Sequence, residues 1–421
     1  MAGDRVALLL PGSAAYVELV VALLRRGVFP VPMDPHLTPG ERDSLLADLA
    51  PAQVLTTQDA LEQLLATLGP STGPLLGRPI HLTSGTTGRP KGVWSGLLEE
   101  TEAVALVAEE RDLWGFAPDD VHLVLSPLHH SAPLRFATGT LLAGGRLVVP
   151  GPFDPARATA AMAEHRPTTM FCVPTHLQRL FAHWGAHGTP DLSCFRLVAH
   201  AGAPCPAWVK RRLLEEFPAR STWEFYGSTE GQFTACRSEE WRERPGTLGR
   251  ARPGRTLQVD DDGHLWCVVP GHARFTYVGD PAKTRAAWRE TADGPAFTVG
   301  DLGRIDEDGH VHLDGRREDL VISGGVNVYP AEVERVLGEA AGVEDVAVFG
   351  LDDDRWGQRV CAAVVGAVDP EALAAYARAH LAPAKRPKEY HRLEVLPRTP
   401  TGKVRRLDLP SLVASEPAGE G

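Results

Sequence analysis

One loop in the sequence, LTSGTTGRPKG at residues 82–92, has a composition that suits anion binding. Its glycines allow backbone N–H groups to approach an anion closely, and its Ser and Thr hydroxyls add further donors. Lys91 adds a cation that can follow a mobile phosphate. The loop is not a Walker A sequence, because Gly92 rather than Ser or Thr follows Lys91. A surface linker is the plain alternative for a Gly/Ser/Thr stretch, but the ordered Pro-Lys-Gly favours phosphate binding.

The residues around this loop predict alternating strands and helices. Short apolar runs are typical of buried strands, and the segments between them carry apolar residues at helical spacing. Strands separated by such helices favour a mostly parallel sheet covered on both faces. The predicted strands are 5–10, 51–57, 121–126, 146–150, 168–173, 196–200 and 222–226, and the predicted helices are 14–27, 38–50, 97–113, 155–165, 174–183 and 206–217.

The pattern changes after about Gly249, where Asp-Gly pairs divide the apolar runs. Such pairs are typical of hairpin turns and predict a small β subdomain at about 250–315. The charged stretch GRRED at 315–319 then predicts a joint between domains. The Asp-Gly pairs are Asp262-Gly263, Asp308-Gly309 and Asp314-Gly315.

Beyond the joint, the sequence predicts a compact α+β unit. Its helices are expected to begin at Ala331 and Glu371, and its strands to cover 344–350, 360–365 and 390–396. The predicted fold class is therefore α/β, with a large N-terminal body of mostly parallel sheets covered by helices plus the β subdomain, hinged to a small α+β C-terminal domain. The predicted ranges are 1–316 for the body, 317–411 for the C-terminal domain and 412–421 for a disordered tail.

Composition excludes several classes of partner. The 421 residues carry a formal net charge of −11, which argues against nucleic acid or an anionic membrane, since both favour a basic surface. Six cysteines lack any CxxC pair and are expected to be reduced thiols. Neither a signal-peptide core nor a membrane-spanning apolar run is present. We expect a cytoplasmic protein with no membrane insertion.

The phosphate loop and six further segments, in order, resemble the adenylate-forming (AMP-binding) enzyme superfamily. Within it the chain looks most like fatty-acyl and bile-acid-type acyl-CoA ligases. The resemblance implies ATP, Mg²⁺ and a small-molecule carboxylic acid as cofactors and substrate. The six segments are SPLHHSAP (126–133), HAGAP (200–204), YGSTEG (226–231), VGDLGRID (299–306), DGRREDLVISGGVNVYPAEVE (314–334) and LPRTPTGKVRR (396–406).

The resemblance also assigns a role to each matching residue. Lys91, Glu230, His130 and Lys403 are implied in catalysis: Glu230 as the ligand of Mg²⁺, and Lys403 as a bridge between the acid and the α-phosphate. Lys91 and its loop neighbours Thr83, Ser84, Gly85, Thr86, Thr87 and Gly88 would hold the phosphates. The rest of the ATP site would be Gly202, Ala203, Pro204, Phe225, Tyr226, Gly227, Thr229, Asp301 and Arg316. The acid would contact His129, His130, Phe136, Gly202 and Gly227.

Each of these roles has a plain structural alternative. Glu230 alone would be a solvated surface acid, and Asp301 a turn residue before a hairpin. Lys403 has arginines near it and would fit a basic surface loop. His130 follows a bend at Pro127 and lacks a base-like partner in the sequence, so it is expected to shape the acid pocket rather than to act as a general base.

A second half-reaction is implied at the same site, in which a thiol attacks the adenylate. Lys403 must then leave, by a rotation about a hinge placed at Glu318. The backbone of Ser323, Gly324 and Gly325 would face coenzyme A. Relative to the superfamily, the N-terminal body looks trimmed before GDRVALLLPGS, which leaves room for a homodimer whose partner covers the gap.

The acid is expected to be apolar, whether fatty, alicyclic or aryl. The stretch SAPLRFATGTLLAGG at 131–145 carries a single charge, Arg135, and Arg135 leaves open a second carboxylate on the acid. The favoured function is an ATP-dependent, AMP-forming acyl-CoA ligase. Two alternatives stay open: transfer of the acyl group to a carrier protein or an amine, and a non-catalytic nucleotide or acyl sensor.

Overall fold

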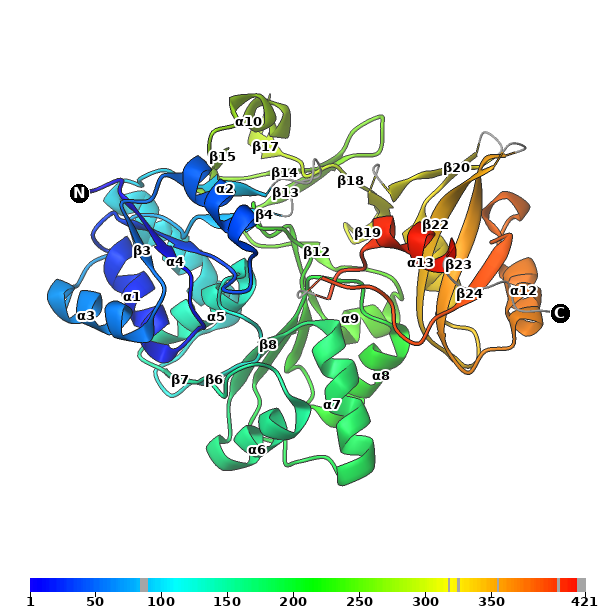
Figure 1. Cartoon of the computed structure of the whole chain (residues 1–421), viewed down its shortest axis with the longest axis horizontal. Coiled ribbons are helices and arrows are strands. Elements are labelled where there is room, and N and C mark those ends of the chain that lie inside the picture. The colour runs from blue at the N-terminus through cyan, green and yellow to red at the C-terminus, as the bar shows by residue number, and fades with distance from the viewer. Residues whose placement is uncertain (84–89, 317–318, 324–325, 354–355, 400–401, 415–421) are drawn as a thin grey trace.

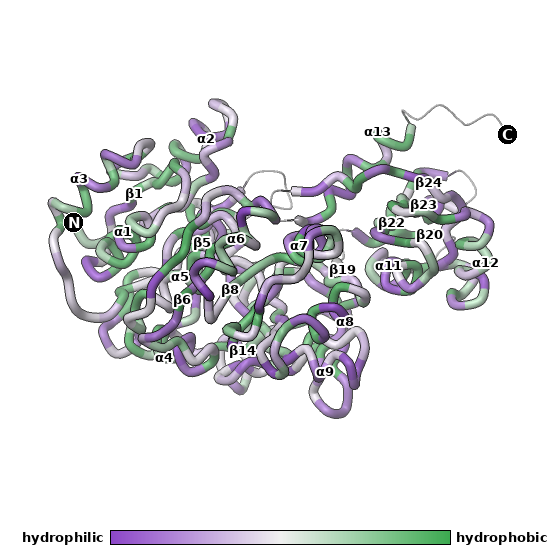
Figure 2. Tube along the Cα trace, turned by 90° about the horizontal axis from the view of Figure 1, so that it is seen from below, coloured by the Kyte–Doolittle hydropathy of each residue, from purple (hydrophilic) through white to green (hydrophobic). Residues whose placement is uncertain are grey.

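The computed structural model describes residues 1–83, 90–316, 319–323, 326–353, 356–399 and 402–414. The chain forms a large body and, at the right of Figure 1, a smaller C-terminal unit. Strands such as β8 and β23 are coloured hydrophobic in Figure 2, as expected for buried strands. Among the described residues, no helix is long and apolar enough to cross a membrane.

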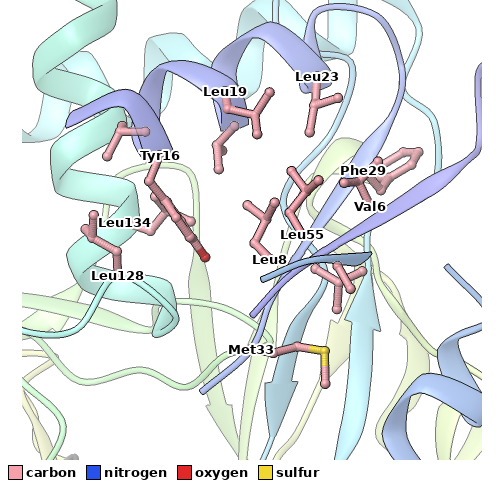
Figure 3. Close-up of a cluster of buried hydrophobic side chains, with 14 of the residues drawn as sticks. Val6, Leu8, Tyr16, Leu19, Leu23, Phe29, Met33, Leu55, Leu128 and Leu134 are labelled. Carbon is pink, nitrogen blue, oxygen red and sulfur yellow. The ribbon is translucent and has the colours of Figure 1, made fainter. Parts of the chain in front are cut away.

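The first part of the body is a parallel sheet in the order β2-β1-β3. Tyr16, Leu19 and Leu23 of the first helix point toward the strands and pack on Leu8 and Leu55 (Figure 3). These elements are β1 (Arg5–Leu8), α1 (Ala14–Leu24), β2 (Phe29–Pro32), α2 (Pro39–Leu49), β3 (Gln53–Leu55) and α3 (Gln58–Leu68). A capping box formed by Thr38 and Glu41 begins α2.

A seven-stranded sheet forms the centre of the body, in the order β12-β11-β10-β9-β8-β6-β7. The strands from β10 to β7 are parallel, and β11 and β12 are antiparallel to their neighbours. The strands are β6 (Val121–Val124), β7 (Arg146–Val148), β8 (Thr169–Cys172), β9 (Leu197–His200), β10 (Thr222–Glu224), β11 (Thr234–Arg237) and β12 (Arg250–Ala251). The helices of this region are α4 (Glu100–Trp114), α5 (Ser131–Leu142), α6 (Pro155–His165), α7 (Pro174–His187), α8 (Ala207–Glu216) and α9 (Ser238–Glu243).

Antiparallel strands complete the body. A four-stranded sheet runs β13-β14-β17-β16, a three-stranded sheet runs β15-β5-β4, and β18 pairs with β19. The elements are β4 (His81–Thr83), β5 (Lys91–Trp94), β13 (Thr256–Val259), β14 (Leu265–Val268), η1 (Gly271–Ala273), β15 (Thr276–Tyr277), α10 (Pro281–Ala287), β16 (Trp288–Thr291), β17 (Gly294–Phe297), β18 (Asp301–Ile305) and β19 (Val311–Arg316).

The C-terminal unit is built on a sheet in the order β21-β20-β23-β22, with β24 parallel to β23. The helices α11 and α12 pack on it through a core of their own. The elements are β20 (Val321–Ser323), β21 (Val326–Val328), α11 (Pro330–Leu337), β22 (Val343–Asp353), β23 (Gly357–Gly366), α12 (Pro370–His380), η3 (Pro383–Lys385), β24 (Glu389–Arg392), η4 (Arg406–Asp408) and α13 (Leu409–Ala414).

The predicted fold class is confirmed, with local corrections. Asp262-Gly263 and Asp308-Gly309 form the predicted turns, but Asp314-Gly315 lies within β19, where Gly315 pairs with Leu302 beside a register shift. Glycine tolerates the φ of 139° that this position requires. Helices α3 and α5 were not predicted. Residues 412–414, assigned to the disordered tail, end helix α13, and residues from 415 onward lie outside the described residues. The domain ranges stay predictions.

Candidate active site

The phosphate loop connects two paired strands. In the hairpin of β4 and β5, Thr83 lies opposite Lys91, and the Thr83 hydroxyl donates to the Lys91 carbonyl oxygen at 3.4 Å. The ammonium of Lys91 lies 3.8 Å from a carboxylate oxygen of Asp280. This pairing brings the two ends of the loop together. The predicted phosphate ligands Ser84, Gly85, Thr86, Thr87 and Gly88 lie outside the described residues.

Three of the predicted segments follow neighbouring parallel strands. The segment with His129 and His130 follows β6, Gly202 follows β9, and Phe225 and Tyr226 follow β10. The carboxyl ends of parallel strands meet at one edge of a sheet, which is where ligands bind in α/β folds. Residues that are far apart in the sequence are thereby brought to one site. Ala203, Pro204, Gly227 and Thr229 lie in the same connecting segments.

Two buried carboxylates are held by tyrosines. Glu230 is 6% exposed, and its Oε1 accepts a hydrogen bond from the Tyr277 hydroxyl at 2.7 Å. Asp301 is also 6% exposed, and its Oδ2 accepts from the Tyr226 hydroxyl at 2.6 Å. Both positions contrast with their plain alternatives, a surface acid and a turn aspartate. A buried carboxylate is costly unless it has partners, so these positions point to function.

Arg316 lies at the end of β19, directly opposite Asp301 in the register of β18 and β19. The predicted hinge residue, Glu318, and the predicted coenzyme A residues Gly324 and Gly325 lie outside the described residues. Ser323 is buried at the end of β20, where it pairs with Val326 and Gly357.

Three histidines, one from β4 and two from the segment that follows β6, lie close together. The Nδ1–H of His81 donates to the carbonyl oxygen of His129 at 3.2 Å, and the rings of His129 and His130 lie 4.1 Å apart. Burial lowers the pKa of His81 to about 4 and that of His130 to about 3. Burial also lowers the pKa of His129. All three imidazoles are therefore neutral near pH 7. A neutral His130 agrees with a role in shaping the pocket.

Lys403 reaches this cluster from the C-terminal unit. Its positive charge contributes to the lowered pKa of His130, and the preceding Gly402 lies against Thr175 at the start of α7. In Figure 1 the red segment before α13 extends from the right-hand unit to the middle of the molecule. Lys403 itself is exposed, and its backbone N–H donates to the Thr399 hydroxyl at 3.1 Å.

A cavity of about 240 Å³ lies beside these residues. It extends from Ser228, Thr229 and Glu230 to the apolar faces of α4 and α5, and His81, Ser131 and Arg135 also line it. His129 and His130 are next to the cavity without lining it. Phe136, predicted to contact the acid, does not line it either: its ring is fully buried between Trp114, Phe171 and Phe225.

Several residues that line this cavity, and Tyr277, which holds Glu230, were missed in the sequence. They come from four separate segments, and no local spacing links them. Glu109 and Glu110 lie on α4, and Arg255 forms two hydrogen bonds to Glu109, at 3.2 and 2.8 Å. Burial raises the pKa of Glu110, but Arg135 and Arg252 more than offset this and lower it to about 2. The missed residues are Arg78, His81, Glu109, Glu110, Arg252, Arg255 and Tyr277.

Comparison with known proteins assigns the chain to a family. The AMP-binding enzyme family matches residues 1–74 and 80–273, and the AMP-binding enzyme C-terminal domain matches residues 332–403. The chain belongs to the AMP-binding enzyme family. The superfamily predicted from the motifs is thus confirmed.

Individual relatives agree with this assignment. An indoleacetate–CoA ligase of Aromatoleum aromaticum is 33% identical, over 96% of this chain and 87% of the relative. A feruloyl-CoA synthase of an Amycolatopsis species is 34% identical over the same shares. The crystal structure of ATP-bound MatB from Rhodopseudomonas palustris is 29% identical with a TM-score of 0.81, over 99% of this chain and 90% of that one. The predicted class, an AMP-forming acid–thiol ligase that acts through an acyl-adenylate, is confirmed.

Proposed function

We propose that this ligase activates an aryl or arylalkyl carboxylic acid with ATP and transfers the acyl group to coenzyme A. One observation carries the proposal: a cavity lined by apolar residues such as Leu106, Leu134 and Leu142, together with charged side chains, opens directly onto the nucleotide segment at Ser228, Thr229 and Glu230. Its volume of about 240 Å³ is below the roughly 300–1,000 Å³ typical of sites for drug-sized ligands. A small ring system suits such a cavity better than a long acyl chain.

The relatives support the aryl class among the apolar acids that the sequence left open. Both curated relatives are named for acids with an aromatic ring, indoleacetate and ferulate. We therefore propose an aryl acid as the substrate, in place of the fatty or bile acid that the finer resemblance favoured.

The first half-reaction joins the acid to the nucleotide. A carboxylate oxygen of the acid attacks the α-phosphorus of ATP, and the bond from that phosphorus to pyrophosphate breaks. Lys403 would neutralise charge where the carboxylate meets the α-phosphate, and Lys91 would bind the departing phosphates. Asp301, fixed by Tyr226, would accept hydrogen bonds from the ribose hydroxyls. Arg316, opposite Asp301, would contact ribose or phosphate.

Glu230 fits the role of a Mg²⁺ ligand. Its carboxylate lines the cavity, and the Tyr277 hydroxyl fixes one of its oxygens. Mg²⁺ takes oxygen ligands and commonly combines one or two carboxylates with substrate phosphates. When bound, Mg²⁺ would reduce the negative charge on the phosphates.

The second half-reaction transfers the acyl group. The sulfur of coenzyme A attacks the acyl carbon, its proton passes to solvent, and AMP leaves. We propose that rotation about Glu318 withdraws Lys403 and brings the segment at Ser323 to the site.

A panel of acids tests the proposal. Fatty, alicyclic, aryl and amino acids would be compared in ATP–pyrophosphate exchange, followed by thioester formation with coenzyme A. We expect the highest exchange with small aryl acids and a thioester product that requires coenzyme A. Preference for an amino acid or a long-chain fatty acid would contradict the proposed acid class. Acyl transfer to an amine or a carrier protein in place of coenzyme A would contradict the proposed acceptor.

A further inference from the structure

The wall of the acid cavity contains more cationic side chains than an apolar acid requires. Five arginines line the cavity together with only two acidic residues of α4, Glu109 and Glu110. Glu230, the third carboxylate of the wall, is held by Tyr277 near the nucleotide segment. The five arginines are Arg78, Arg111, Arg135, Arg252 and Arg255; of these, Arg111 is exposed and donates to Asp112.

Two of the arginines pair with the acidic residues of α4. Arg255 binds Glu109 through both terminal nitrogens. Arg252 donates to Glu110 at 2.7 Å and to the side-chain oxygen of Gln232 at 3.3 Å. His272 also lies 2.7 Å from Glu109. These contacts use most of the acceptor capacity of the two carboxylates.

Arg135 has a weaker partner. Its Nε lies 3.5 Å from Oε2 of Glu110, and its guanidinium lies over the ring of Phe225, 5.2 Å from the ring centroid. Glu110 already binds Arg252 and the indole N–H of Trp114. Arg135 therefore shares a carboxylate that is largely occupied.

Arg78 forms no ion pair with a carboxylate within 4.0 Å in the described part of the chain. Its Nη1 donates to the backbone carbonyl oxygen of Glu230 at 3.2 Å, and its buried Nη2 has no acceptor there. Burial, followed by repulsion from Arg255 and Arg135, lowers the pKa of Arg78 to about 10, so the guanidinium is still charged at neutral pH. Glu110 and Glu109 attract this charge from beyond ion-pair distance. A half-buried guanidinium with no carboxylate in direct contact is unfavourable, which indicates that the cavity suits an anion.

We propose that the acid substrate carries a second carboxylate, and that Arg78 binds this group while the first carboxylate reacts with ATP. The proposal rests on the proposed function, because it concerns the same cavity. A guanidinium suits the role, since its planar fork matches a carboxylate and forms charge-assisted hydrogen bonds. Arg135 lies close enough to add to the positive field, whereas Arg252 and Arg255 are neutralised by α4. An acid with only an apolar tail would leave Arg78 unpaired.

The consequence is a measurable preference for diacids. A charge-assisted hydrogen bond in such a site corresponds to a preference of about 10- to 100-fold. We therefore expect a ring-carboxylated 3-phenylpropanoate, in at least one of its 2-, 3- and 4-carboxy isomers, to exceed 3-phenylpropanoate by this factor.

The preference would be measured by binding and by turnover. Calorimetry with α,β-methylene-ATP present would give the affinity of each acid, and pyrophosphate exchange would give kcat/KM. Arg78→Met should abolish the preference, measured as the ratio of diacid to 3-phenylpropanoate within the same variant, and Arg78→Lys should restore part of it. The backbone N–H of Arg78, which donates to Ser95, is unaffected by either change. Arg285→Met, an exposed position in α10, serves as the control and should keep the parent preference.

The outcomes separate this proposal from the proposed function. Equal binding of the diacid and the monoacid by the parent protein would overturn the role of Arg78, even if exchange with aryl monoacids is robust. Equal loss of both acids in a folded Arg78→Met protein would also overturn it, because a purely structural role predicts that result. Absence of exchange with every acid would contradict the proposed function, whereas the calorimetric preference and its loss in Arg78→Met would still decide the role of Arg78.

Discussion

The body and the C-terminal unit present their candidate site residues in opposite ways. In the body, Glu230 and Asp301 are buried and each is fixed by a tyrosine hydroxyl from another segment. In the C-terminal unit, Lys403 is exposed on a loop. Its backbone N–H donates to Thr399 of the same loop, and the preceding Gly402 lies against Thr175 of the body. The contrast teaches how the proposed roles fit the structure: residues proposed to act throughout the reaction are built into a packed core, whereas a residue proposed to act in one half-reaction lies on an exposed loop.

The largest expected effect tests Lys403, the candidate residue on the exposed loop of the C-terminal unit. Lys403→Ala should slow adenylation by about 10²- to 10³-fold, the scale for loss of one transition-state donor. The same variant, supplied with synthetic acyl-adenylate and coenzyme A, should form thioester at close to the parent rate. Pyrophosphate exchange and thioester formation would be measured separately. Arg405→Ala, a neighbouring exposed cation, should change neither rate. Equal loss of both half-reactions in a folded Lys403→Ala protein would contradict the comparison.

The second prediction concerns the joint between the two regions. Proline fixes φ near −65°, so Glu318→Pro should hold the C-terminal unit in one orientation. We expect the two half-reactions to change by factors that differ about 10-fold or more. Single-turnover measurements of adenylation and of thioester formation would show the difference. If the two rates change by the same factor, or if neither changes, the pivot lies elsewhere.

The third prediction tests the buried carboxylate of Asp301 in the body. Tyr226→Phe removes the hydroxyl that holds Asp301 and leaves a buried carboxylate with one partner fewer. We expect the KM for ATP to rise about 10-fold, from the cost of losing one hydrogen bond to a charged group. Both half-reactions should weaken, because the nucleotide is held in both. Tyr16→Phe is a matched control, since the Tyr16 hydroxyl is buried in α1 without a partner in the described residues. An unchanged KM for ATP in Tyr226→Phe would show that Asp301 does not depend on this bond.

A change of pH is expected to have the smallest effect on activity. It should act on the free energy of unfolding of the body. Burial lowers the pKa of His122 to about 3, below its ordinary value of about 6.5. Between these values the unfolded chain binds a proton that the folded chain does not, so stability is complete above about pH 6.5 and falls as the pH decreases. His122 should contribute a slope of about 1.4 kcal/mol per pH unit to the free energy of unfolding.

Denaturant unfolding at pH 5 to 7 would measure that slope. His122→Asn can keep a hydrogen bond to Thr169, whose hydroxyl lies 2.9 Å from Nδ1, and it cannot be protonated. The slope should be shallower in this variant. His187→Asn, at an exposed position of α7, should leave it unchanged. An equal slope in parent and His122→Asn would exclude His122 as a source of acid sensitivity.

Much of the fold followed from local patterns. The spacing of apolar residues predicted β1, β3 and β6 to β10 and the helices α1, α2, α4 and α6 to α8 of the body. The turn at Asp308-Gly309 was visible in two residues. Helix α5 was missed because apolar residues occupy most of SAPLRFATGTLL, so no face stands out. The turn predicted at Asp314-Gly315 was wrong because a pairing with β18, set by residues distant in the sequence, outweighs the local preference.

The sequence by itself determined the chemistry of this protein. The glycine loop by its residue types predicted phosphate binding. The resemblance to the adenylate-forming superfamily, carried by this loop, YGSTEG and the segment of Lys403, predicted an AMP-forming ligase. Only the tertiary structure brought together the residues from which we propose the acid class. Arg78, Glu110 and Arg252 come from separate segments and meet because the order of strands and the packing of α4 place them together. Whether a charge is paired depends on such distant neighbours, and so the unpaired Arg78 emerged only once the chain was folded.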